Sequence, residues 1–487
     1  MIKRLKKIFL YSGGIAALVI AAGVLAALLI DADRYKPYAE TTVSDALGMD
    51  FRINGSMKIT LLPFGLSAQD VTIRNMETDF FSAEKLAVGL KLFPLIRREI
   101  RINKFSADKP RFFIERDKNG KFNFERKKPK TDGGLPAGLP AIEKVSMAGG
   151  EISYSDRVSG LSREIREFDL TVSNLEFAGH EKTGLLKNIS FEGDFKCRSI
   201  RTKDLELKDV KFGVKGKDGI FGISPLSVGL FGGKGSGSME IDITGEEAVV
   251  RVRFAASKFL FEKFVETIST KKIIKGTMDF DIDVTAKGKN IDEIKKKVNG
   301  EVMLKGENLI LYSMDIDNLL TKIEKSRTFS LIDIGTFFLV GPLGVAATKG
   351  YDYAALYMAT GEAEGSISRL ISKWKIKNSV LQAEDVALTT KINRLALKGR
   401  LDFVKKRYDG VIVGVLDRKG CLKLSQKIEG PFSNPKIERM STAETIAGPV
   451  ITMYEYAKKI LSSGECKPFY EGSLKHPSKD NFLLLPF

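Results

Sequence analysis

Residues able to perform acid–base or metal chemistry are sparse in this 487-residue sequence. It contains only two histidines, His180 and His476, and neither has a neighbour at the spacing of a metal-binding pair. The sequence lacks the Gly-x-Ser-x-Gly elbow of hydrolases, the Walker phosphate loop and the dinucleotide-binding fingerprint. We therefore expect no catalytic residue, no metal site and no cofactor.

Three aspartates at alternate positions, Asp279, Asp281 and Asp283, could begin a calcium-binding loop. The sixth position of such a loop requires glycine for its sharp turn, but Val284 stands there. The twelfth position requires glutamate, and Asn290 stands there instead. We therefore interpret the three carboxylates as the solvated face of a strand.

Apolar residues alternate with polar ones through much of the chain, as in the stretch GTMDFDIDVTAKG. Successive side chains of a strand point to opposite faces, so each such stretch has one apolar and one polar face. A closed sandwich core and a groove that is open to a lipid chain have the same pattern. If the apolar faces form a groove, its candidate lining residues are Ile189, Phe191, Phe195, Met239, Ile241, Ile243, Val250, Val252, Phe254, Met278, Phe280, Ile282 and Val284.

Three cysteines occur, and two of them lie near the C-terminus. A disulfide between Cys421 and Cys466 would close a loop of about 45 residues and, in the chain-entropy model, stabilise the fold by roughly 4 kcal/mol. Cys197 is left without a partner. It is in phase with Phe191 and Phe195, so we expect a buried thiol on an apolar face.

The formal net charge of +17 is concentrated in short segments. Between Arg97 and Lys130 there are 13 basic and five acidic residues. No nucleic-acid-reading motif accompanies them, so a membrane surface is the expected anionic partner and nucleic acid is not. An equally simple interpretation is a solvated hairpin and linker. The basic candidates for membrane contact are Arg126, Lys127, Lys128 and Lys130.

The N-terminal segment Ile8–Ile30 has no charged residue over 23 positions. As a helix it would be roughly 35 Å long, which suffices to span a bilayer. Basic residues precede it and Asp31 follows it, so the positive-inside rule predicts a cytoplasmic N-terminus and an external remainder. The alternative, a cleaved signal peptide, usually has a shorter apolar run of about 7 to 15 residues.

Local patterns predict several elements. The stretch RYKPYAETTVSDALG favours a short helix that ends at Gly48. Asn119 and Gly120 favour a tight turn. Apolar residues at helical spacing predict helices over residues 316–325 and 443–461.

The expected fold class is mainly β with short helices: a transmembrane helix followed by a long, curved, mostly antiparallel sheet that forms a groove. The predicted division is a cytoplasmic tail and anchor at 1–30, a β-rich region at 31–126, a linker or mobile loop at 127–140, a sheet groove at 141–440, and a C-terminal helix and tail at 441–487.

Two parts of the sequence resemble the AsmA family. The first is YKPYAETTVSDALGMDFRINGSMKITLLPFGLSAQDVTIRN, which contains Gly48, Gly55, Pro63 and Asn75. The second begins at NSVLQAEDV and ends at GPFSNPKIE; it is similar to the closing pattern of the family. Its matching residues are Asp385, Gly399, Asp402, Gly430, Asn434 and Pro435.

The resemblance implies a bacterial inner-membrane protein whose bulk lies in the periplasm. It further implies a relation to bridge-like lipid-transfer proteins, with an apolar groove for phospholipid acyl chains and a part in outer-membrane lipid homeostasis and biogenesis. No enzyme activity follows from it. The competing hypothesis is an assembly scaffold whose exposed sheet edges pair with outer-membrane or other envelope proteins.

Overall fold

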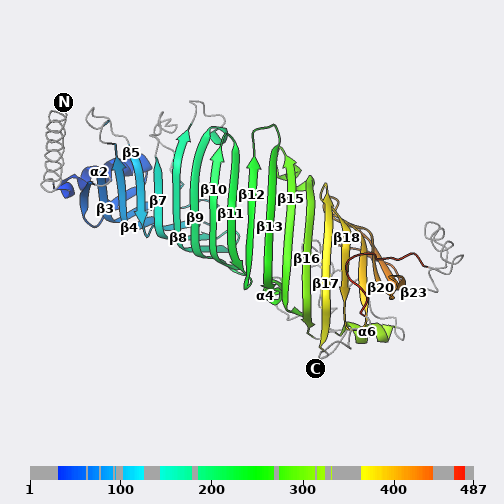
Figure 1. Cartoon of the computed structure of the whole chain (residues 1–487). Helices are drawn as coiled ribbons and strands as arrows, with labels where there is room; N and C mark the ends of the chain where they lie inside the picture. Colours follow the sequence, from blue (N-terminus) through cyan, green and yellow to red (C-terminus); the bar gives the residue numbers. More distant parts are fainter. Residues whose placement is uncertain are drawn as a thin grey trace, which may run out of the picture. The chain divides into compact units, whose positions relative to one another are not determined.

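Figure 1 shows a computed structural model of the chain, which is mainly β. It describes residues 31–61, 64–75, 78–91, 94, 102–125, 143–177, 185–267, 274–312, 315–323, 331, 364–442 and 466–477. The predicted anchor at 8–30, the linker at 127–140, the helix at 443–461 and the basic candidates Arg126, Lys127, Lys128 and Lys130 lie outside the described residues. Within the described ranges, no helix combines the length and the apolar character needed to span a membrane.

The chain divides into two compact units between Ile223 and Ser224. We call the part before this point unit 1 and the part after it unit 2. The division falls inside strand β11 (Ile220–Leu230). Alternation of apolar and polar residues continues through β11, which is why the sequence-based division places both sides in one region, 141–440.

Unit 1 begins with the 3-10 helix η1 (Ala32–Tyr35) and helix α2 (Lys36–Leu47). Pro37 lies in the first turn of α2, where a missing backbone N–H costs little. Gly48 follows with a φ of 67°, a left-handed conformation that glycine adopts without steric cost, and its N–H donates to the carbonyl of Ser44 at 2.7 Å. The predicted end of this helix is confirmed.

The strands of unit 1 form a mostly antiparallel sheet. Strands β1 (Asp50–Ile53) and β2 (Met57–Leu61) both pair with β3 (Phe64–Asn75), which pairs with β4 (Thr78–Leu90). Next come β5 (Ile102–Asp108) and β6 (Arg111–Arg116), which pair with β4 and run parallel to β7 (Lys144–Asp156). The antiparallel series β8 (Leu161–Phe177), β9 (Ile189–Thr202) and β10 (Glu206–Lys217) follows, with η2 (Leu185–Lys187) between β8 and β9 in the chain.

Strands β5 and β6 behave as one strand that is interrupted at Lys109 and Pro110. Proline has no N–H to donate to a neighbouring strand, so the regular strand is interrupted there. The N–H of Lys109 still donates to the carbonyl of Ala148 at 2.7 Å, and the carbonyl of Pro110 accepts from the N–H of Glu151 at 2.8 Å. After β6, the N–H of Gly120 donates to the carbonyl of Asp117 at 3.0 Å, and Arg116 bridges to Phe122. The predicted turn at Gly120 is thus confirmed. The chain after the turn pairs with β6 through one isolated β-bridge and does not form a full strand.

Unit 2 contains one antiparallel series of strands. Its order is β12 (Gly233–Asp242), β13 (Ala248–Leu260), β15 (Thr277–Gly288), β16 (Val298–Leu311), β17 (Gly365–Lys377), β18 (Val380–Thr389), β19 (Arg394–Asp402), β20 (Arg407–Leu416) and β21 (Leu422–Pro431). The short β14 (Ile274–Lys275) pairs with β16, while β22 (Lys436–Ile437) and β23 (Ser441–Thr442) pair with β21.

Three described helices in unit 2 lie between strands in the chain. They are α4 (Phe261–Glu266), α5 (Ile291–Lys296) and α6 (Ile316–Ile323). Helix α6 confirms the apolar helix predicted from residue 316. Its Asp317 accepts hydrogen bonds from the Thr390 hydroxyl and, at 2.8 Å, from the Asn393 side-chain amide. These bonds hold α6 beside the turn between β18 and β19.

Part of the strands from β17 to β20 is buried on both faces. On one face, Trp374, Leu388 and Val413 belong to the main core of unit 2, which also includes Ile316 and Leu320 of α6. On the other face, Ala387 and other residues lie under residues 466–477, which we call the C-terminal strap. The expected groove over 141–440 is therefore not open along its whole length, because helix and strap side chains enclose both faces here.

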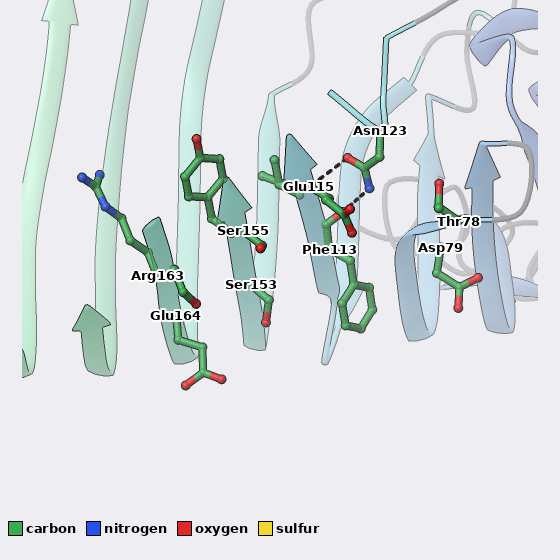
Figure 2. A pocket seen from close by; sticks show the side chains of 12 residues that line it. Thr78, Asp79, Phe113, Glu115, Asn123, Ser153, Ser155, Arg163 and Glu164 are labelled. Atoms are coloured by element: carbon green, nitrogen blue, oxygen red, sulfur yellow. Dashed lines mark hydrogen bonds between the residues drawn. The ribbon is translucent and has the colours of Figure 1, made fainter. Parts of the chain in front are cut away.

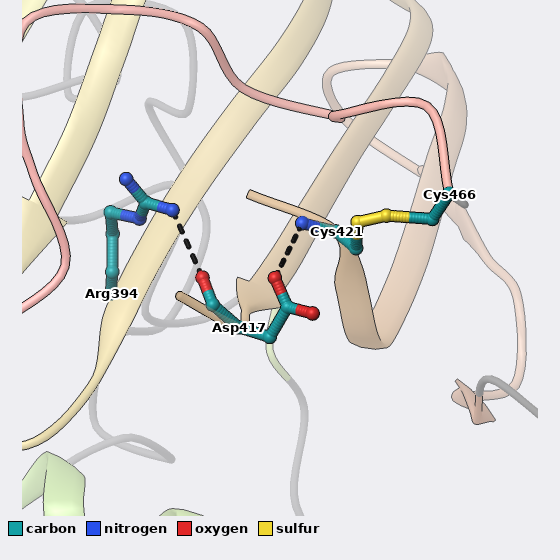
Figure 3. Close-up of a disulfide and its surroundings, with 4 residues drawn as sticks. All are labelled: Arg394, Asp417, Cys421 and Cys466. Atoms are coloured by element: carbon teal, nitrogen blue, oxygen red, sulfur yellow. Dashed lines mark hydrogen bonds between the residues drawn. A yellow bond between two sulfur atoms is a disulfide. The ribbon is translucent and has the colours of Figure 1, made fainter. Parts of the chain in front are cut away.

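The C-terminal strap is attached by a disulfide between Cys421 and Cys466, whose Cα atoms are 6.1 Å apart (Figure 3). Arg394 reaches the strap from β19, donating to the carbonyl of Leu474 at 3.0 Å and to that of Asp417 at 2.9 Å. Tyr470 of the strap donates its hydroxyl hydrogen to Asp385. A covalent link and several hydrogen bonds therefore fix this segment against the sheet.

Candidate functional site

The apolar residues of β12, β13 and β15 form neighbouring rows on one face of unit 2. Strand pairing places Met239 beside Val252, and Val252 beside Val284. In the next row, Phe254 lies beside Ile282. Paired residues of antiparallel strands share a face, so these side chains form one apolar surface. The strands that form it carry the predicted lining residues Met239, Ile241, Val250, Val252, Phe254, Met278, Phe280, Ile282 and Val284, while Ile243 follows the end of β12.

The predicted lining residues of unit 2 differ in exposure. All of them are half-buried except Met278, which is 2% exposed and belongs to the main core. A half-buried apolar side chain leaves hydrocarbon surface available to a ligand, whereas an enclosed one does not. The structure therefore keeps most of these residues accessible and places Met278 within the packed end near α4.

The opposite face of these strands is charged, and charged pairs continue on β16, β17 and β18. Arg253 and Asp283 form an ion pair at 3.1 Å. Lys373 lies 2.7 Å from Glu384 and 3.3 Å from Glu301, and these carboxylates raise the pKa of its ammonium group through hydrogen bonding and Coulomb attraction. The aspartates of β15 thus lie on a solvated strand face, as the sequence predicts.

Unit 1 also has an apolar face, and it is rich in phenylalanine. The predicted lining residue Phe195 lies between Phe168 and Phe212, with ring centroids 6.1 Å and 4.9 Å away. Phe191 is half-buried beside Phe221 at 6.3 Å, and Ile189 pairs with Phe177 of β8. Phe191 and Phe195 therefore share a face with aromatic neighbours, and Ile189 lies on the same strand.

The row of rings in unit 1 continues beyond the predicted residues. Phe112 lies 6.4 Å from Phe168 and 5.0 Å from Phe81, so the rings cross β4, β6, β8, β9 and β10. Sequence reasoning missed Phe81, Phe112 and Phe212 because they are far apart in the chain. Only the strand register, which pairs Phe81 with Phe112 and Phe195 with Phe212, brings them together.

Cys197 lies on this apolar face and is 4% exposed. Its register partners are Phe168 on β8 and Val210 on β10. Burial raises the pKa of the thiol, since a thiolate would lose its hydration among these side chains. The prediction of a buried thiol on an apolar face is confirmed.

A polar hollow of about 370 Å³ lies on unit 1, between β6 and β8 (Figure 2). Phe113 and Glu115 line one side, and the shorter Ser153 and Ser155 come from the adjacent β7. Glu115 pairs with Arg157 at 2.6 Å. Its carboxylate is thereby held by a guanidinium rather than directed at a ligand.

The titratable groups of the described chain do not assemble a metal site. Among the described residues, no group of three or more His, Cys, Asp or Glu side chains is arranged to hold a metal ion. The ring nitrogen Nδ1 of His476 lies 2.8 Å from the carbonyl of Pro477, while His180 lies outside the described residues.

An apolar pocket lies in unit 2 next to α4, and sequence reasoning did not identify it as a site. Its volume is about 180 Å³. Phe254 and Phe280 are among the predicted lining residues, whereas the remaining wall residues were not. We call it the aromatic pocket; its walls are Leu230, Phe231, Phe254, Ala256, Phe259, Phe264 and Phe280.

Comparison with known proteins identifies the family. The model of the AsmA family matches residues 1–179 and again residues 178–386. The match includes the middle of the chain, which the sequence resemblance left out, and ends before Gly399 and the rest of the closing pattern. No curated protein and no solved structure matches the chain. Because two consecutive matches cover most of its length, the chain belongs to the AsmA family.

Proposed function

We propose that this protein binds or conducts phospholipid acyl chains along the half-buried apolar faces of its sheets. The observation that carries the proposal is the surface formed by Met239, Val252, Val284, Phe254 and Ile282 in unit 2. Transfer of an acyl chain from water onto such a surface is favourable by about 0.8 kcal/mol per fully buried CH₂ group. A long acyl chain has enough methylenes to offset the cost of association without a specific polar contact.

The cellular setting is part of the same proposal. Membership of the AsmA family and the apolar segment Ile8–Ile30 support a protein that is anchored in the bacterial inner membrane by a single span. Its N-terminus would be cytoplasmic and its sheets periplasmic, where it would support outer-membrane lipid homeostasis and biogenesis. The basic residues 126–130 would contact anionic headgroups. Binding of this kind requires no catalytic residue.

Two adjacent residues of β15 provide a matched test. Ile282 belongs to the apolar face, and Asp281 to the charged face of the same strand. A photoreactive amino acid at position 282 of the full-length protein should form adducts with phospholipid in cells, and the same residue at position 281 should not. Native mass spectrometry of the detergent-extracted protein should also detect bound phospholipid.

The competing scaffold hypothesis makes the opposite prediction. Crosslinking from position 281 would recover one protein in stoichiometric amount, and crosslinking from position 282 would give no lipid adduct. A protein that is extracted without any phospholipid would contradict the lipid-binding proposal.

A further inference from the structure

The aromatic pocket lies over a small residue of β13, Ala256. Gly235 is the register partner of Ala256, which is 3% exposed. Along β13, Ala256 lies between Phe254 and Phe259. A methyl group therefore occupies a position where the flanking side chains on the same strand are rings. The short methyl group of Ala256 does not fill the space between the surrounding rings, and this space is the pocket. The position of Gly235 itself is covered by the side chains of Phe254, Leu230 and Val228.

Helix α4 supplies the far wall of the pocket. The ring of Phe264 packs edge-on against that of Phe231, with centroids 5.7 Å apart and an interplanar angle of 84°. Phe261 and Val265 of the same helix are 5% and 3% exposed, so they anchor the helix in the main core. The wall is consequently part of a packed element and not a freely rotating side chain.

All seven residues that line the pocket are apolar. Water gains few hydrogen bonds in such a space, and apolar spaces of about 150 Å³ in other proteins accept small hydrocarbons. The volume of about 180 Å³ is therefore suited to a short hydrocarbon segment. A polar headgroup would lose its hydration there without gaining a partner.

The pocket is continuous with the candidate apolar face. Phe254 and Phe280 line the pocket, and they are also register neighbours of Ile282 and Ala256 in the rows of that face. A linear chain that lies on the face can therefore enter the pocket by its end. Because only hydrocarbon suits the pocket, the entering end must be the methyl end.

We propose that the aromatic pocket binds the methyl end of a single acyl chain and so defines where a lipid tail stops on unit 2. This inference rests on the proposed function, but it is more specific. It assigns a chain-end site to Ala256 and its ring neighbours, and it sets the direction of the tail toward α4.

The test uses full-length protein and a phospholipid with a diazirine at the terminal carbon of one acyl chain. Adducts on the wild-type protein should concentrate in peptides that contain residues 254–264. Ala256→Phe should fill the pocket and reduce adducts in these peptides at least tenfold. Ala255→Phe is the matched control, because Ala255 pairs with Ser236 and Asp281 on the opposite face, and it should leave the adducts unchanged.

Ala256→Leu, which adds less volume, provides a second variant if Ala256→Phe does not fold. It should give an intermediate reduction. Adducts spread evenly over β12 to β16, or an unchanged pattern in both Ala256 variants, would overturn the chain-end site while leaving lipid binding intact. Absence of bound phospholipid from the wild-type protein by native mass spectrometry would instead overturn the proposed function itself.

Discussion

Single residues decide how closely the aromatic rows pack. Gly150 of β7 is the register partner of Phe168, which is 2% exposed. A Cβ atom at Gly150 would lie 2.4 Å from two carbons of the Phe168 ring. The glycine is required because the ring occupies the space of its missing side chain.

Replacing Gly150 with alanine should therefore strain unit 1. The enclosed ring of Phe168 has little room to move, so we expect Gly150→Ala to lower the free energy of unfolding by about 1–3 kcal/mol. Gly222→Ala is the control, since nothing lies within 4 Å of the added atom. Denaturant unfolding measures both variants, and equal effects would contradict this account of Gly150.

The thiol of Cys197 provides a second test at this scale. Because burial raises its pKa and excludes reagents, we expect iodoacetamide to label it far more slowly in the native protein than in guanidinium chloride. Because Cys421 and Cys466 form a disulfide, Cys197 is the only free thiol of the three cysteines, so mass spectrometry without a reductant can follow it alone. Equal labelling rates in the two conditions would show that the apolar face of β9 opens readily.

At the scale of elements, the C-terminal strap determines which part of the sheet is closed. It packs Tyr470 and Leu474 over Ile371, Ala387 and other residues of β17 to β20. Without the strap these apolar side chains would face solvent. The substitution Cys466→Ser removes the disulfide, so residues 466–477 should exchange their amide hydrogens faster. It should also lower the free energy of unfolding by up to about 4 kcal/mol, the chain-entropy value for this loop. Unchanged protection would mean that the noncovalent contacts hold the strap alone.

The strap should also respond to alkaline pH. Burial and the hydrogen bond to Asp385 raise the pKa of Tyr470 above its ordinary value of about 10. A raised native pKa means that the stabilisation is complete below about pH 10 and is lost as the pH rises further. Protection of residues 466–477 should thus fall above pH 10 in the wild type, and Tyr470→Phe should be less protected but less dependent on pH in this range.

At the scale of the whole molecule, the strands of both units have two chemically different faces. Each unit has strands with one apolar and one charged face, and in each, part of the apolar face is lined with half-buried side chains. Surface of this kind has a cost in water unless something apolar covers it. Lipid tails are the covering that the proposed function supplies.

A charge placed on the apolar face should weaken lipid binding while the protein still folds. Ile282→Asp puts a carboxylate on the half-buried face, so we expect bound phospholipid to fall at least about tenfold, equivalent to about 1.4 kcal/mol. Asp281→Lys changes charge on the solvated face and should leave lipid binding unchanged. Both variants are quantified by lipid extraction and mass spectrometry, with melting temperature as the folding control. Equal lipid retention would contradict binding on the face of Ile282.

Much of the local structure follows from sequence patterns. The helix that ends at Gly48, the turn at Gly120, helix α6 and the alternating strand of Asp279 to Asp283 all depend on contacts within a few residues. The candidate lining residues were predicted for the same reason, since a period of two identifies a face. Met278 follows the same period and is nevertheless enclosed, because burial depends on what α4 and its neighbours cover.

The sequence by itself determined the family, the mainly antiparallel strands and the sidedness of each strand, because these depend on residue order and short-range spacing. Only the tertiary structure decided which rings meet, where the strap closes the sheet, and that Ala256 and its ring neighbours form a pocket beside α4. Strand register and helix docking join residues that are distant in the chain. No local pattern encodes that register, and the contacts it creates decide which apolar surface remains accessible.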